Sequence, residues 1–282
     1  ESRGLVMRGD VLRGRRGQPA TPLFLNPQGA LSIGIEIGWR HYEVLVLEMS
    51  GKTLASVRRS YAWPDANTIF GEIAADTGLP VQWFNDGNAA CWAEMMAQPN
   101  PRPQGFSYFQ IGTFVGAGLV ANGELWEGNG HAANLGSMLV CDEDGKPTFV
   151  HLIASISALQ DLLAAAGVTI PNGSPFNWDW DALEPVVTQW LDRAGLSLAK
   201  AIVNTHAVLE LDKSVIDGVM PRPIVERLLE RVQYHLATLP TLTADHPPVE
   251  IGHLGASAAA NGAARLVLFQ RFFSRAWKLF ST

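Results

Sequence analysis

The sequence predicts an α/β protein with mixed sheets. Strand-like and helix-like segments alternate along most of the chain, and the first of them form a meander of strands. Of the 282 residues, 47% are hydrophobic, which is enough for a sizeable core, and only 17% are charged. No apolar run reaches the roughly 18 residues that a bilayer span needs. We therefore expect a soluble, cytoplasmic protein of one or two domains.

The segments before residue 106 are expected to form a meander of strands, followed by a helix, a short strand and a second helix. Alternating apolar residues over 31–60 predict the meander, and an apolar pattern at helical spacing over 66–74 predicts a helix. A short buried strand is expected at 79–84, followed by a turn into a helix within 85–97. The proline-rich break at 99–105 is the best candidate for a domain boundary.

The later segments predict a second α/β region. Residues 106–128 are typical of two strands, with a hairpin signal at Asn122-Gly123, and residues 213–217 predict a short strand between helices. The periodicity of apolar residues predicts the helices of this region. They are expected at about 151–166, 180–193, 195–210, 222–238 and 255–279.

The net charge of −6 is divided unevenly along the chain. Residues 1–25 carry five arginines against two acidic residues, a local charge of +3, whereas the remainder has 16 basic against 25 acidic residues, or −9. A basic arm on an acidic body indicates a contact with nucleic acid or phosphate near the N-terminus. Arg13, Arg15 and Arg16 are the residues nominated for DNA contact, and a solvated loop is the alternative.

Turns that contain glycine or aspartate recur at the ends of the expected strands. Such turns let a backbone approach a ligand closely and present N–H groups to anions, which is how nucleotide and sugar sites are built in α/β proteins. None has the pattern of a Walker loop or of a dinucleotide fingerprint. The four turns are Glu36–Gly38, Asn85–Asn88, Gly112–Gly118 and Asp217-Gly218.

In order and spacing, these segments resemble the ROK family of repressors, open reading frames of unknown role and sugar kinases, which belongs to the actin-like ATPase superfamily. Residues 14–38 resemble the join between a winged helix-turn-helix domain and the first strand of the ROK body. Residues 79–94 resemble the family's Asn-Asp segment, and 111–138 its glycine-rich signature. Residues 211–221 and 255–266 resemble its late Gly-Gly and Gly-Ala-Ala segments.

The resemblance implies two actin-like, ribonuclease H-like α/β subdomains around a cleft. Residues 1–25 would be the wing and linker that remain of an N-terminal winged helix-turn-helix domain. Residues 26–105 together with 258–282 would form the first subdomain, and 106–257 the second. The family pattern has several dozen more residues between the meander and Leu79, which either were lost in this lineage or are omitted from the sequence. For this family 282 residues are expected to be part of a longer protein.

The resemblance also implies a sugar site. Asn85 and Asp86 stand where ROK kinases hold the sugar and take a proton from its hydroxyl, so Asp86 would be the catalytic base of a kinase. Asn134 and Ser137 replace the Glu and His of the family's Glu-x-Gly-His, and His151 stands where a second sugar-binding Glu usually sits. The alternatives are a helix N-cap for Asn85 and Asp86, and a surface histidine for His151.

Three segments that bind phosphate in ROK kinases depart from the family pattern. Glu36 replaces the first Asp of Asp-x-Gly-x-Thr, Phe114 the second Gly of Gly-Thr-Gly, and Asp217 the first Gly of the late Gly-Gly pair. The three-Cys zinc motif is absent, and Cys91 and Cys141 are too few for an all-cysteine site. We therefore expect a protein that is not an enzyme and holds neither a cofactor nor a metal.

These observations predict a ROK-type transcriptional regulator, a repressor, whose kinase-like body binds a sugar or sugar-derived effector without phosphorylating it. The alternatives are an ATP-dependent sugar kinase and an effector-free module for binding or oligomerisation. The expected partners are DNA, through the N-terminal domain, the sugar-like effector and further copies of the chain. The apolar stretch 266–280 could serve that self-association, and no membrane partner is expected.

Overall fold

The computed structural model shows two compact units, the first formed by residues 1–83 with 260–282 and the second by 84–259. Unit 2 begins directly before helix α2 (Asp86–Ala97), because this helix packs on strands of unit 2. Each unit is described by itself below. The structure describes residues 3–12, 20–39, 41–61, 69, 71, 74, 75, 77–129, 133–240 and 246–273.

Unit 1 is built on a three-stranded antiparallel meander in the order β3-β4-β5, as the alternating pattern predicts. Leu45 and Leu47 point to one face of this sheet and pack against Ala260 and Ala264 of helix α7. A Cβ atom at Gly34 would collide with the backbone of Ala260, so the glycine allows the helix to lie directly on the sheet. The elements are β3 (Leu31–Ile37), β4 (His41–Glu48), β5 (Thr53–Ser60) and α7 (Ala258–Phe272).

The N-terminal residues of unit 1 form a two-stranded antiparallel ribbon of β1 (Val6–Arg8) and β2 (Leu23–Leu25). An isolated bridge between Leu12 and Ala20 extends it. Arg13, Arg15 and Arg16 fall between these bridge partners in the sequence and lie outside the described residues. The side-chain amide of Asn26 donates to the Gly4 carbonyl at 2.7 Å and so fixes the base of the ribbon.

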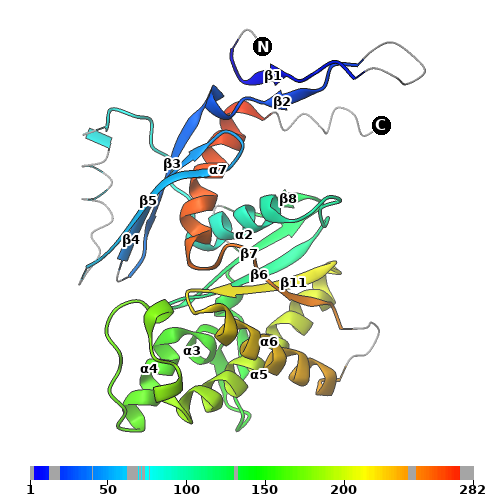
Figure 1. Ribbon diagram of the computed structural model, residues 1–282. Helices are drawn as coiled ribbons and strands as arrows, with labels where there is room; N and C mark the ends of the chain where they lie inside the picture. The colour runs from blue at the N-terminus through cyan, green and yellow to red at the C-terminus, as the bar shows by residue number, and fades with distance from the viewer. Residues whose placement is uncertain are drawn as a thin grey trace. The chain divides into compact units, whose positions relative to one another are not determined.

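Unit 2 contains a mixed five-stranded sheet in the order β12-β11-β6-β7-β8. Strand β6 is buried along its whole length, because α2 covers one face of the sheet and the helices α3 to α6 cover the other (Figure 1). Strands β6, β11 and β12 are parallel, so their carboxyl ends meet at one edge. The strands are β6 (Phe106–Ile111), β7 (Val115–Ala121), β8 (Glu124–Leu125), β11 (Lys213–Gly218) and β12 (Val249–Ile251).

The helical layer of unit 2 supplies its largest hydrophobic core, with Trp190 fully buried at its centre. Where the sequence predicts two helices, over 180–193 and 195–210, the structure has the single helix α5. Gly195 does not end the helix, because it serves as the close contact with Arg231 of α6. No described helix is long and apolar enough to cross a membrane. The helices are α3 (His151–Ala154), α4 (Ile156–Ala165), α5 (Val186–Leu209) and α6 (Arg222–Thr238).

Short elements account for most of the remaining differences from expectation. Residues 79–84 form no strand, and Leu79 and Trp83 are 53% and 56% exposed instead of buried. The expected helix over 151–166 is divided at Ser155, whose hydroxyl caps α4 by accepting from the Ala158 N–H. Several small elements were not anticipated, because three-residue pieces carry almost no periodic signal. Among them are β9 (Leu139–Cys141), β10 (Pro147–Phe149), β12, η2 (Leu135–Ser137) and η5 (Gly255–Ser257).

Candidate functional site

Asn85 and Asp86 lie at the N-terminus of α2 and have different tasks there. Asn85 has an extended backbone, and its side-chain oxygen accepts the Asn88 N–H at 3.0 Å, so it is the N-cap of the helix. Asp86 follows in the first turn, is exposed, and accepts the Gly87 N–H at 2.8 Å through Oδ1. Asp86 is therefore a carboxylate held by the backbone and open to solvent.

Strand β7 positions this end of the helix. A Cβ atom at Gly87 would collide with the backbone of Ala117, so only glycine lets the first turn of α2 rest on the strand. Gly118 receives the next turn in the same way, because a Cβ there would collide with the side chain of Cys91. The glycines of the signature therefore fix Asp86 beside the beginning of β7.

The turn that contains Asn134 and Ser137 lies against the same strand. A Cβ atom at Gly136 would collide with the carbonyl oxygen of Val115, which is two residues, roughly 7 Å, along β7 from Ala117. Asn134 is exposed and caps η2 without using its side-chain amide, while its carbonyl accepts the Ser137 N–H at 3.0 Å. Among the described residues, the side-chain amide of Asn134 is thus not used to cap η2.

His151 is attached to this turn by a hydrogen bond. Its Nδ1 lies 2.9 Å from the carbonyl oxygen of Gly136, and because a carbonyl only accepts, Nδ1 carries the proton. In the neutral ring Nε2 is then an acceptor. The start of α2 with Asn85 and Asp86 thus packs on Ala117, and the turn of Asn134 and Ser137, with His151, packs on Val115 of the same strand. The roles of these residues stay predictions.

A buried carboxylate that the sequence analysis did not single out lies farther along α2. Glu94 is fully buried; its Oε1 contacts Nδ1 of His253 at 2.7 Å, and its Oε2 accepts the His253 N–H at 2.9 Å. Gln98, one turn later, also donates to Oε1. The network ties α2 to the loop after β12. In the sequence, the only indication of Glu94 was the Ala-Glu pair at the end of the segment 79–94, which resembles the family's Asn-Asp segment.

Asp217, at the end of β11, belongs to the same buried region. Its carboxylate accepts the N–H groups of Gly218 at 2.9 Å and Gly255 at 2.8 Å, and Tyr108 OH lies 3.5 Å away. Burial raises the pKa of Asp217, against the lowering effect of the backbone hydrogen bonds. Asp217 therefore holds the 252–255 loop from inside and does not present a free negative charge at the strand end.

The other two departures from the kinase pattern also have defined surroundings. In unit 1, Glu36 lies 3.5 Å from Nε2 of His41 and 3.9 Å from Arg58. In unit 2, Phe114 is 44% exposed and its ring meets that of His151 edge-on, with the centroids 6.2 Å apart. The side chain of Phe114, which replaces a glycine of a phosphate-binding segment, thus contacts His151, one of the residues predicted to bind sugar.

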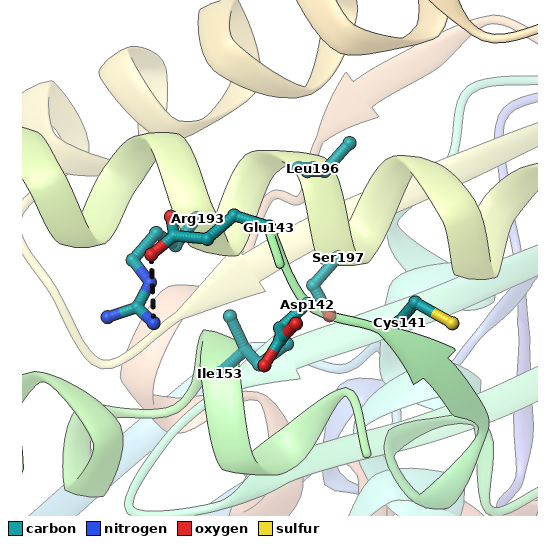
Figure 2. A pocket seen from close by; sticks show the side chains of 7 residues that line it. All are labelled: Cys141, Asp142, Glu143, Ile153, Arg193, Leu196 and Ser197. Atoms are coloured by element: carbon teal, nitrogen blue, oxygen red, sulfur yellow. Dashed lines mark ion pairs between the residues drawn. The ribbon is translucent and has the colours of Figure 1, made fainter. Parts of the chain in front are cut away.

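Figure 2 shows a small pocket of unit 2 between the end of β9 and helix α5. The ion pair of Glu143 and Arg193, 3.3 Å long, closes one side, and the buried hydroxyl of Ser197 has no hydrogen-bond partner among the described residues. None of the five described residues predicted to bind sugar lines this pocket. Within the described part of the chain, no group of three acidic, His or Cys residues could hold a metal ion.

The pattern of the ROK family matches residues 60–270, about three quarters of the chain. The chain therefore belongs to the ROK family. The α/β architecture of the described residues is that of the actin-like ROK fold.

Several relatives of known name are similar to this chain. An N-acetylmannosamine kinase of Vibrio cholerae is 30% identical over 195 residues, which cover 67% of this chain and 66% of the relative. A glucokinase of Halalkalibacterium halodurans is 28% identical over 220 residues, covering 70% and 66%. The uncharacterized protein y4fQ of Sinorhizobium fredii is 28% identical, and the matched region spans only 49% of its length. The chain thus spans one half to two thirds of these proteins.

Solved structures agree on the fold at low sequence identity. A ROK family glucokinase from Streptomyces griseus, in complex with glucose and AMPPNP, superposes with a TM-score of 0.65 at 18% identity, covering 84% of this chain and 99% of that one. A ROK family transcriptional regulator, a homolog of the E. coli MLC protein, gives 0.68 at 18% identity and covers 95% of this chain and 86% of that one. Kinases and a regulator therefore share this architecture.

The expectation that the chain is not an enzyme is contradicted by the relatives, because the two with a named activity are sugar kinases. One of the three departures behind that expectation is the replacement of a glycine by Asp217, whose carboxylate is buried and bonded to two backbone N–H groups. Residue identity alone did not reveal where that side chain points.

Proposed function

We propose that this chain is the body of an ATP-dependent sugar kinase in which Asp86 is the catalytic base. The observation that carries the proposal is the exposed carboxylate of Asp86 at the start of a helix that rests on Ala117 of β7. The turn of Asn134 and Ser137, which is bonded to His151, rests on Val115 of the same strand. A base must reach a hydroxyl that is held by other groups, and this arrangement offers both. The names of the kinase relatives support the same activity.

The proposed reaction is a direct phosphoryl transfer. The sugar hydroxyl donates its proton to Asp86 while its oxygen forms a bond to the γ-phosphorus of magnesium-bound ATP, and the bond from that phosphorus to the bridging oxygen breaks. ADP leaves with the bridging oxygen and its electron pair. Because Asp86 is exposed, the proton it has taken passes directly to water.

The sugar would be oriented by the neighbouring polar groups. The amide of Asn134 and the hydroxyl of Ser137 can both donate and accept, and Nε2 of His151 can accept from a sugar hydroxyl. Asn85 is already engaged as the N-cap, so its role is to hold the first turn of α2, and with it Asp86, in place. A cytoplasmic location, as the sequence predicts, would supply the ATP.

A coupled assay of ADP release over a panel of hexoses and amino sugars, with ATP and Mg²⁺, tests this proposal. We expect turnover with at least one sugar and a loss of about 100- to 10,000-fold in kcat for Asp86→Asn. Asp161→Asn, at an exposed position on α4, is the matched control and should keep full turnover. ADP release that is absent with every sugar, or equal in Asp86→Asn and the parent protein, would overturn the proposal.

A second candidate is a sugar-responsive regulator of transcription, which the N-terminal ribbon favours. The ribbon of β1 and β2 lies outside the residues that the family pattern matches, and the superposition with the ROK regulator extends over 95% of this chain. In this proposal Arg13, Arg15 and Arg16 contact DNA phosphates as part of a winged helix-turn-helix, and the protein acts as a homo-oligomer.

Binding of the full-length gene product to its own promoter region tests the second candidate. We expect affinity that falls steeply with salt, and a shallower salt dependence when Arg13, Arg15 and Arg16 are all changed to Gln. Binding that is insensitive to salt, or equal in the triple variant, would reject the DNA contact. It would leave the kinase proposal untouched, since that rests on unit 2.

A further inference from the structure

Exposed apolar side chains surround His151 on the surface of unit 2. Phe149 stacks on the imidazole with an interplanar angle of 6° and a centroid distance of 5.9 Å, and Phe114 meets it edge-on at 85°. Both phenyl rings remain about two fifths exposed, at 42% and 44%. Leu139, directly opposite Phe149 in the pairing of β9 and β10, is 59% exposed and points to the same face. We call these three apolar side chains the aromatic patch.

The aromatic patch is continuous with the candidate sugar site through His151. The Gly136 carbonyl fixes Nδ1 as the donor, so the outer edge of the ring offers an acceptor while its faces and rim adjoin the phenyl groups. One imidazole thus touches both a polar turn and an apolar surface. A ligand held by Asn134, Ser137 and Nε2 of His151 would place its next substituent against Phe114 and Phe149.

We propose that the aromatic patch binds an apolar substituent of the sugar, so that the preferred ligand is a hexose derivative carrying an aryl or alkyl group. The inference rests on the proposed sugar site and names the class of ligand for it. The patch has no charged member, and phenyl rings at these spacings provide flat surface for an aryl or alkyl group at little cost in ligand hydration. An unsubstituted hexose would leave this surface wet.

The position of Phe114 strengthens the assignment. Its backbone closes the turn after β6, with the Gly112 N–H donating to the Phe114 carbonyl at 3.0 Å. The Ile156 N–H of helix α4 donates to the Gly112 carbonyl at 2.9 Å. The backbone of the turn is therefore fixed, and its exposed ring is presented from a rigid base. A fixed backbone limits the conformational entropy that is lost when the ring of Phe114 contacts a ligand.

Calorimetric titration with glucose, mannose and their phenyl glycosides tests the proposal on the whole chain. We expect the phenyl glycoside of one sugar to bind about five- to tenfold more tightly than the parent sugar. In Phe114→Ala and in Phe149→Ala this preference should shrink to about twofold or less, while the affinity for the parent sugar stays unchanged. Phe176→Ala, at a phenylalanine that is 55% exposed elsewhere in unit 2, is the matched control and should keep the preference.

Three other outcomes of the titration would overturn the aromatic patch, and one of them would also overturn the proposed sugar site. Equal affinity for the parent sugars and their phenyl glycosides would overturn the aromatic patch and leave the sugar site standing. An equal loss of both ligands in the phenylalanine variants, with unchanged thermal unfolding, would show that the rings bind the sugar itself and would also overturn it. If no ligand of the panel binds, the patch and the proposed sugar site both fail.

Discussion

Helix α2 carries one acidic residue in its first turn, Asp86, and another about two turns later, Glu94, in opposite surroundings. Asp86 is exposed and accepts one N–H from the neighbouring Gly87. Glu94 has no exposed surface and is bonded to Gln98 and twice to His253. The same functional group on the same helix can therefore be free for proton transfer or fully engaged in holding the fold.

The difference follows from what each end of the helix meets. At its first turn α2 rests on the backbone of β7 through glycine, and the side chain of Asp86 is exposed. Farther along it lies under the loop after β12, where a carboxylate must satisfy polar groups that burial has removed from water. The predictions below test whether stability and chemistry separate along α2 in this way, and they run from the largest expected effect to the smallest.

Glu94→Ala should have the largest effect on stability. The change leaves the buried side chain of Gln98, the half-exposed side chain of His253 and the backbone N–H of His253 without their acceptor, which costs about 3 kcal/mol of unfolding free energy. Urea denaturation followed by circular dichroism measures it. Glu94→Gln keeps an acceptor oxygen and should cost less than half as much. If both variants unfold like the parent, Glu94 does not hold α2.

Gly87→Ala should be the next largest, because it forces α2 away from β7. The added methyl group collides with the Ala117 backbone, and overpacking of this kind costs about 1–3 kcal/mol. Gly116→Ala on the same strand is the matched control, since its Cβ would meet neighbours only at 3.7 Å and beyond. Thermal unfolding of both variants compares them, and equal midpoints would contradict the close contact.

Asp192→Asn tests a paired carboxylate that is exposed, in contrast to Glu94. Burial raises its pKa, but hydrogen bonds from Arg231 and His235 outweigh that effect and lower it. A carboxyl group whose pKa is lowered by folding stabilises the fold at pH values above its pKa in the unfolded state. This contribution is lost as the pH falls through the pKa of the folded state. Because the Asp192 side chain is 50% exposed, the variant should lose at most about 1 kcal/mol near neutral pH, with no difference in strong acid.

Asp217→Asn should produce the smallest effect, a change in the slope of stability with pH. The folded pKa of Asp217 is raised, mainly by burial, so its contribution is fully present below the unfolded pKa and falls as pH rises through the folded pKa. The unfolding free energy of the parent should therefore fall relative to that of Asp217→Asn on going from about pH 4 to pH 7. A difference that is constant over this range, in urea titrations, would contradict the shift.

The sequence predicted the strands and helices that carry a long periodic pattern, such as β6, β7 and α6. It missed β9, β10 and β12, because strands of three residues carry almost no periodic signal, and β12 also depends on pairing with the distant strand β11. It divided α5 at Gly195, since a glycine that ends a helix and one that admits a neighbouring helix look identical in sequence.

The candidate site was predicted where it follows a local motif. Asn85 and Asp86 were found in one segment, and their place at the start of a helix was among the alternatives. The pairing of Glu94 with His253 joins residues 159 positions apart, and the buried contacts of Asp217 depend on how the 252–255 loop folds back. Such contacts are decided by tertiary packing, which no local pattern records.

The most direct test of the separation along α2 is to measure both sugar affinity and turnover in Asp86→Asn and Glu94→Gln. The account predicts that Asp86→Asn unfolds like the parent and binds sugar with an affinity within about threefold of it, yet loses about 100-fold or more in kcat. Glu94→Gln should show reduced stability and retain most of its turnover at a temperature where it is folded. An Asp86→Asn protein that turns over at the parent rate would contradict the account.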